Sequence, residues 1–170
     1  MTKRTILLLL AAFIAMDVLA VATFVLFSRS DRDTPDYVQA LRNPDTGSVK
    51  LLALVSSEAM QAQGEAKPWA VRGTASLTHK SALQACEEVS RLIHTGGDEA
   101  KCFNPRHALF LTSGGTRYEY VICFECEQMR VYRSESRLET VPIPNAPDTL
   151  DALLKAAGVE PTPGPRKGKS

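Results

Sequence analysis

Hydrophobic residues form one long run near the start of the chain, followed by shorter strand-like and helix-like patterns. The long run covers residues 6–27, and Asp17 and Thr23 interrupt it. A helix of these 22 residues would rise roughly 33 Å, which is enough to cross the core of a bilayer. The run therefore predicts either an uncleaved signal anchor, that is a transmembrane helix, or a cleaved signal peptide.

Charges and small residues around the run bear on its orientation and fate. Lys3 and Arg4 precede it, and positive charge before a span favours an N-terminus inside and a C-terminus outside the cytoplasm. Ala20-Val21-Ala22 is a small-x-small cleavage signal, although the chain stays apolar after it. We expect an inner-membrane anchor with the following domain outside the cytoplasm, and cleavage near Ala22, giving a periplasmic or secreted protein, is the alternative.

The remaining chain divides into three parts by composition. Residues 28–48 are polar and rich in proline and aspartate, which predicts a tether. Residues 49–159 carry the periodic patterns of one exported domain. Residues 160–170 contain three prolines and two glycines, which predicts a disordered tail.

The first half of this domain predicts two strands and a helix. Residues 49–55 are a compact apolar run, and residues 69–77 alternate with a period of two, which is typical of a half-buried strand. Gly73 inside the second strand indicates a bulge or a close backbone approach. A capping-box pattern at Ser81 then predicts a helix whose buried stripe is Leu83, Cys86, Val89 and Ile93.

The second half predicts a hairpin, a third strand and a closing helix. Residues 107–112 and 117–124 flank a turn at Ser113-Gly-Gly, and residues 129–133 form the next strand. The apolar positions change parity between Phe124 and Met129, which requires a bulge or a turn. A final helix is expected from an Asp148 cap to Gly158. Strands and helices do not alternate strictly, so we predict an α+β fold with a mainly antiparallel sheet and two packed helices.

The charge balance narrows the classes of partner. The chain has 20 Lys+Arg and 19 Asp+Glu, and 18 of each lie after residue 27. A balanced domain lacks the basic footprint of a nucleic-acid-binding protein. Paired carboxylates at helical spacing, a nucleophile elbow and a phosphate-binding motif are also missing from the sequence. We therefore leave enzymatic activity open and favour a non-catalytic domain that binds an envelope protein.

The densest chemistry in the sequence is a group of three cysteines and a histidine: Cys102, His107, Cys123 and Cys126. Four Cys/His ligands could hold a structural Zn²⁺, with the Cys-x-x-Cys turn supplying two of them. The spacing of Cys102 and His107 is not a standard one for such a site. Zinc is therefore an alternative to a disulfide between Cys102 and either Cys123 or Cys126.

A disulfide is the interpretation that we favour, because thiols of exported proteins are normally paired. A redox-active Cys-x-x-Cys pair normally sits at a helix N-terminus. The residues after Cys126 instead predict a strand. We therefore predict a structural role for the cluster, and keep a thiol-redox or zinc-dependent protein as the alternative function. Cys86 is expected to be a core residue of the helix.

The motifs Cys102-Phe-Asn-Pro-Arg-His107 and Ile122-Cys-Phe-Glu-Cys126 resemble those of a family of uncharacterised bacterial proteins that are exported or membrane-anchored. The resemblance covers roughly residues 49–159 and does not include Cys86. It implies an extracytoplasmic domain and supplies no activity.

Overall fold

The computed structural model describes residues 34–56, 69–97 and 102–163. The expected anchor at residues 6–27 and the cleavage signal at Ala22 lie outside these residues. In the part of the chain that is described, no helix is long and apolar enough to cross a membrane. The chain divides into two compact units, residues 1–36 and 37–170, and the second is the α+β domain.

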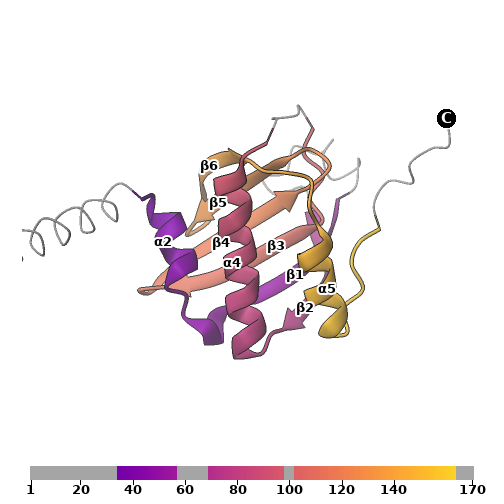
Figure 1. Cartoon of the computed structure of the whole chain (residues 1–170), viewed down its shortest axis with the longest axis horizontal. Coiled ribbons are helices and arrows are strands. Elements are labelled where there is room, and N and C mark those ends of the chain that lie inside the picture. The colour runs from indigo at the N-terminus through magenta and orange to yellow at the C-terminus, as the bar shows by residue number, and fades with distance from the viewer. Residues whose placement is uncertain (1–33, 57–68, 98–101, 164–170) are drawn as a thin grey trace, which may run out of the picture. The chain divides into compact units, whose positions relative to one another are not determined.

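The domain is built on one six-stranded antiparallel sheet with the strand order β2-β1-β3-β4-β5-β6 (Figure 1). All five neighbouring pairs are antiparallel. The strands are β1 (Lys50–Ser56), β2 (Trp69–Ser76), β3 (His107–Ser113), β4 (Thr116–Cys123), β5 (Gln128–Arg133) and β6 (Ser136–Pro142). The prediction of an α+β fold with an antiparallel sheet is confirmed.

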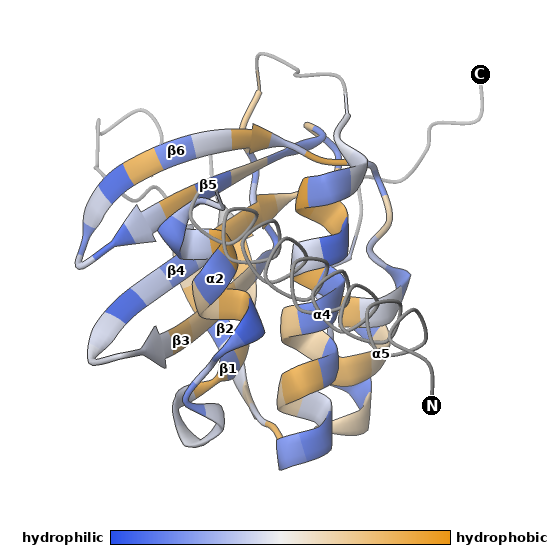
Figure 2. Ribbon diagram, turned by 60° about the vertical axis from the view of Figure 1, so that its left-hand side comes forward, coloured by the Kyte–Doolittle hydropathy of each residue, from blue (hydrophilic) through white to orange (hydrophobic). Residues whose placement is uncertain are grey.

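Among the described residues, three α-helices lie on one face of this sheet, one more than the two that were predicted (Figure 1). They are α2 (Asp36–Arg42), α4 (His79–Thr95) and α5 (Asp148–Ala156), and a short 3-10 turn, η1 (Thr46–Ser48), precedes β1. Figure 2 shows that α4 and α5 each carry a hydrophobic and a hydrophilic side. Their apolar sides join the main core, since Leu92 of α4 and Leu150 of α5 are fully buried.

Alternation along the strands separates two apolar clusters. Leu109 of β3 and Tyr120 of β4 belong to the main core under the helices. Their neighbours Ala108 and Val121 belong to a smaller cluster on the other side of the sheet. This smaller cluster contains no residue of the described helices, and we call its side of the sheet the helix-free face.

For α4 the predicted burial of Cys86 and Val89 is confirmed, whereas the predicted N-cap and the predicted burial of Leu83 were wrong. Thr78, not Ser81, is the N-cap, and its side chain accepts a hydrogen bond from the Ser81 N–H. Leu83, expected in the buried stripe, is 42% exposed. The buried side instead includes Ala82 and Ala85, together with Cys86, Val89 and Leu92. Two alanines let this helix approach the sheet closely, and this small side-chain pattern is hard to recognise in a sequence.

Strand β2 contains the predicted irregularity at Gly73. Ala53 pairs with Gly73 and Leu54 with Val71, so Arg72 is the extra residue of a bulge. Gly73 also provides a close approach, because a Cβ there would lie 2.8 Å from Cγ1 of Val159. The bulge reverses the side of the sheet to which alternate side chains of β2 point, and Val71 therefore points away from the main core.

The expected change of parity between Phe124 and Met129 is a hairpin turn. Cys123 at the end of β4 pairs with Gln128 at the start of β5, and residues 124–127 form the connection. Strand β6 was not predicted. Its exposed edge position leaves Val141 as its one buried residue, so the segment has little hydrophobic alternation.

The ends of the domain also differ in detail from the expectations. The N-cap of α5 is Pro147, and Asp148 is its first helical residue, where a carboxylate favours the positive end of the helix dipole. Within the stretch expected to be a tether, residues Tyr37 to Leu41 contribute four buried side chains to the main core. At the start of the expected tail, the Thr162 hydroxyl donates a hydrogen bond to the Leu54 carbonyl.

Candidate functional site

Cys102 and Cys126 form a disulfide with a Cα–Cα distance of 5.6 Å and a sequence separation of 24 residues. Cys102 is an exposed residue in the segment before β3, and Cys126 is buried in the turn between β4 and β5. The bond therefore ties the approach to β3 to the β4–β5 hairpin. Of the two pairings left open by the sequence, the structure contains the one between Cys102 and Cys126.

Cys123 is a buried thiol at the base of the same turn. Its Sγ accepts hydrogen bonds from the backbone N–H of Asn104 and of Cys126, each at 3.3 Å. Burial raises the pKa of Cys123, although the two N–H donors oppose this shift. The thiol is thus held in its neutral form, with its sulfur acting as a hydrogen-bond acceptor inside the turn.

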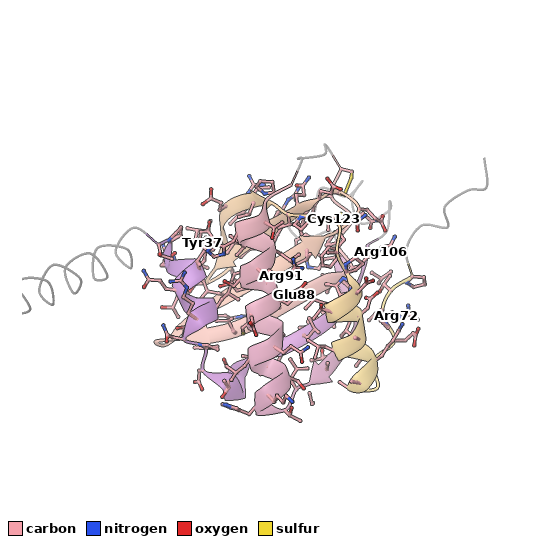
Figure 3. All side chains as sticks on the ribbon, in the orientation of Figure 1. Tyr37, Arg72, Glu88, Arg91, Arg106 and Cys123 are labelled. Atoms are coloured by element: carbon pink, nitrogen blue, oxygen red, sulfur yellow. A yellow bond between two sulfur atoms is a disulfide. The ribbon has the colours of Figure 1, made fainter. Side chains whose placement is uncertain are left out.

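Further contacts hold the residues before β3 against the sheet. The Arg106 guanidinium forms an ion pair with Glu125 in the turn, and Figure 3 shows Arg106 and Cys123 at the same end of the sheet. The Arg106 carbonyl accepts a 2.7 Å hydrogen bond from Leu54 N–H of β1. Gln128 donates from its side-chain amide to the Cys102 carbonyl at 2.8 Å. The disulfide is therefore one link in a continuous set of contacts.

This arrangement places Phe103 on the helix-free face. Its ring makes an edge contact with Trp69 of β2, with 6.0 Å between the ring centroids. The Arg130 guanidinium lies over the same ring, with its central carbon 3.7 Å from the ring centroid. Trp69 also contacts Tyr132 of β5. The segment fixed by the disulfide thus contributes an aromatic side chain to the smaller cluster.

His107, the fourth candidate ligand, lies on the other side of the sheet. It pairs with Ile122 across the β3–β4 ladder, and both point toward the helices. Cys123 follows Ile122 directly, and successive residues of a strand point to opposite faces. His107 instead makes a 2.7 Å contact through Nε2 with Oδ1 of Asp151 on α5. The structure brings the three cysteines together and separates His107 from Cys123.

The chemistry available to the cluster follows from this geometry. Among the described residues, no group of three or more His, Cys, Asp and Glu side chains is arranged to hold a metal ion. The Cys-x-x-Cys pair lies in a β-turn, which lacks the helix dipole that lowers the thiol pKa in redox-active pairs. What the cluster does in this structure is to cross-link two segments of backbone.

Two surface hollows lie away from the cysteines. One has a volume of ≈ 480 Å³ and lies between α2 and α4, where Leu83 and Leu41 meet Glu87, Arg42 and Arg91. Arg91 forms a 2.7 Å ion pair with Glu88, and both are labelled on α4 in Figure 3. This hollow therefore has charges of both signs on or beside its walls.

The other hollow, which we call the sheet hollow, crosses the helix-free face near the β3–β4 turn. Its volume is ≈ 650 Å³. Its lining residues come from η1 and from four adjacent strands: Gly47, Ser48, Lys50, Leu52, Val71, Thr74, Phe110, Leu111, Thr112 and Arg117. Two of these residues are cations and none is acidic.

Arg117 lines the sheet hollow and contacts an aromatic ring there. Its guanidinium carbon lies 5.1 Å from the centroid of the Phe110 ring. Within the part of the chain that is described, neither Arg117 nor Lys50 has an ion-pair partner. Val71 in the same hollow is 55% exposed, more than any other large hydrophobic residue described.

The sheet hollow was not predicted from the sequence. The relevant signal is the set of strand positions that alternate with the apolar core positions, such as Lys50 beside Leu51 and Phe110 beside Leu111. Val71 could not have been placed this way, because the bulge at Arg72 reverses the parity of β2.

Comparison of the chain with protein-family models, with curated proteins and with solved structures gives no match.

Proposed function

We propose that this protein is a non-catalytic binding domain, held at the outer side of the inner membrane by residues 6–27, and that the helix-free face binds a protein partner in the cell envelope. The apolar run with Lys3 and Arg4 before it supports the membrane anchor. The disulfide between Cys102 and Cys126 suits an oxidising compartment.

The observation that carries the proposal is the sheet hollow with its exposed Val71. Val71 is 55% exposed on the helix-free face. An exposed hydrophobic residue that belongs to a larger apolar patch is typical of a surface that another molecule covers. Here it lines one hollow with Leu52 and Phe110.

In this proposal the cysteine cluster has a structural role. The disulfide fixes the residues before β3, and these residues place Phe103 against Trp69 and Arg130 at one end of the helix-free face. The cluster thereby supports the binding face and takes no part in a reaction.

The test is photo-crosslinking in cells that naturally produce the protein. A photo-reactive amino acid is placed at Val71, and in a matched variant at Leu83 of α4, which is 42% exposed on the helix side. The proposal predicts a discrete protein adduct from position 71 and none from position 83. Adducts from position 83 alone, or a lipid adduct at position 71, would contradict it.

A further inference from the structure

We propose that the sheet hollow binds a peptide segment in which a carboxylate side chain lies next to an apolar one. This inference rests on the proposed function, because it names the chemistry of the partner at the same face.

The charge of the hollow selects an acidic partner. Among the described residues, Lys50 and Arg117 are the only charged ones that line the hollow, and neither is neutralised there by an ion pair. Glu119 faces the same side of the sheet beside Phe110, but it is buried and does not line the hollow. An incoming carboxylate therefore meets two cations and no acidic group in the lining.

Arg117 is oriented in advance for this contact. The Phe110 ring supports one face of its guanidinium, which limits the number of conformations that binding has to suppress. A guanidinium held in this way can donate two parallel hydrogen bonds to a carboxylate. The lysine ammonium can reach the same anion without a fixed geometry.

The floor of the hollow supplies the apolar half of the recognition. Leu52, Val71 and Phe110 contribute its apolar surface. Of these, Phe110 pairs with Lys50 across the strands and lies under the Arg117 guanidinium. The hydroxyl groups of Ser48, Thr74 and Thr112 lie around it. Of these, Ser48 already donates to the Asp45 carbonyl and accepts from the Thr112 N–H. The mixture of an apolar floor and a few polar groups is typical of a site that binds a side chain together with its charged neighbour.

A protein segment fits these observations better than a membrane surface. Attraction to anionic lipid normally requires a cluster of about four to eight basic residues, whereas the hollow has two.

The experiment selects ligands without knowledge of the partner. A phage-displayed library of random heptapeptides is panned on the full chain in a mild detergent, and the bound peptides are then measured against two charge-reversal variants. Lys50→Glu with Arg117→Glu changes the sheet hollow. Lys80→Glu with Lys155→Glu makes the same charge change on exposed residues of α4 and α5.

We expect the selected peptides to contain Asp or Glu beside an apolar residue. Their affinity should fall at least about tenfold on Lys50→Glu with Arg117→Glu and stay within about twofold on the control. An equal loss on both variants would indicate a net-charge effect and would overturn the inference.

Three other outcomes show how this inference and the proposed function stand relative to each other. Peptides without acidic residues that lose affinity only on Val71→Arg would show a binding face with a different partner chemistry. In that case the inference fails and the proposed function stands. If no selected peptide responds to any change in the sheet hollow, both fail. A lipid adduct at position 71 in cells, together with peptides insensitive to Lys50→Glu with Arg117→Glu, would replace the peptide by a membrane surface.

Discussion

Nε2 of His107 lies 2.7 Å from Oδ1 of Asp151, and this contact joins the first residue of β3 to α5 across 44 positions of sequence. The imidazole is buried, and its other nitrogen, Nδ1, has no hydrogen-bond partner among the residues that the structure describes. Asp151 is therefore the described partner of Nε2, and the contact adds a polar link between α5 and the sheet.

Asp151→Ala should lower the free energy of unfolding by about 1–3 kcal/mol, because it leaves both nitrogens of a buried imidazole without a partner. Asp151→Asn keeps an acceptor oxygen near Nε2 and should cost less. Urea denaturation of both variants measures the difference. Equal stability of the Ala variant and the unchanged protein would show that the contact contributes nothing.

Loss of the disulfide should be more costly than loss of the neighbouring thiol. Replacing Cys102 and Cys126 together by Ala should lower the free energy of unfolding by about 3 kcal/mol, the value expected from the entropy of closing a loop of this length. Cys123→Ala, the matched control in the same turn, should cost about 1–2 kcal/mol as a small truncation. The measurement is the denaturant midpoint under non-reducing conditions.

Thiol labelling of the same proteins supplies the check. The unreduced, denatured protein should show two reactive thiols, those of Cys86 and Cys123. Four thiols before reduction, or a Cys123→Ala variant less stable than the double variant, would contradict a disulfide between Cys102 and Cys126.

Cys86 should make stability sensitive to alkaline pH. Burial raises the pKa of its thiol from 9.0 to about 12, so the folded state holds this proton more tightly than the unfolded state. The resulting stabilisation is complete below pH 9 and is lost as the pH rises toward 12. Cys86→Ala should cost about 1–2 kcal/mol at pH 7. It should also flatten the fall in stability above pH 9, and denaturation series at pH 7 and pH 10.5 compare the two proteins. If the stability of the two proteins falls equally between pH 7 and pH 10.5, the Cys86 thiol is not the cause of the fall.

Gly97 should not accept a side chain. A Cβ at this position would lie 2.2 Å from the Ile143 carbonyl oxygen, and backbone cannot move away as a side chain can. Gly97→Ala should therefore lower the free energy of unfolding by about 1–3 kcal/mol. Gly47→Ala, where nothing lies within 4 Å of the new atom, should leave it nearly unchanged. Thermal unfolding of the two variants tests this, and similar losses in both would show that the close approach is not limiting.

The parts of the fold that could be predicted are those with a strong hydrophobic period. The β3–β4 hairpin was predictable because Tyr118, Tyr120 and Ile122 alternate regularly, and because both Gly114 and Gly115 adopt the positive φ of a tight turn. The exact buried side of α4 was not predictable, since it includes Ala82 and Ala85, which give a weak hydrophobic signal. Strand β6 was missed because an edge strand buries little.

The candidate site shows the same limit. The closeness of Cys102 and Cys126 followed from the hairpin, but the side of the sheet on which each residue lies depends on register. His107 pairs with Ile122, and this single pairing separates it from Cys123. A register of this kind, and the bulge that exposes Val71, cannot be obtained from composition or spacing alone.

Binding through the helix-free face is tested most directly with the partner that the crosslinker at position 71 captures. The affinity of this partner is measured for two matched variants of the full chain. Val71→Arg changes the sheet hollow, and Leu83→Arg changes the hollow between α2 and α4. Both residues are exposed, so neither substitution should unfold the domain. If the partner binds the helix-free face, Val71→Arg weakens binding at least about tenfold and Leu83→Arg changes it less than about twofold. The reverse order, or no effect of Val71→Arg, would contradict binding through the helix-free face.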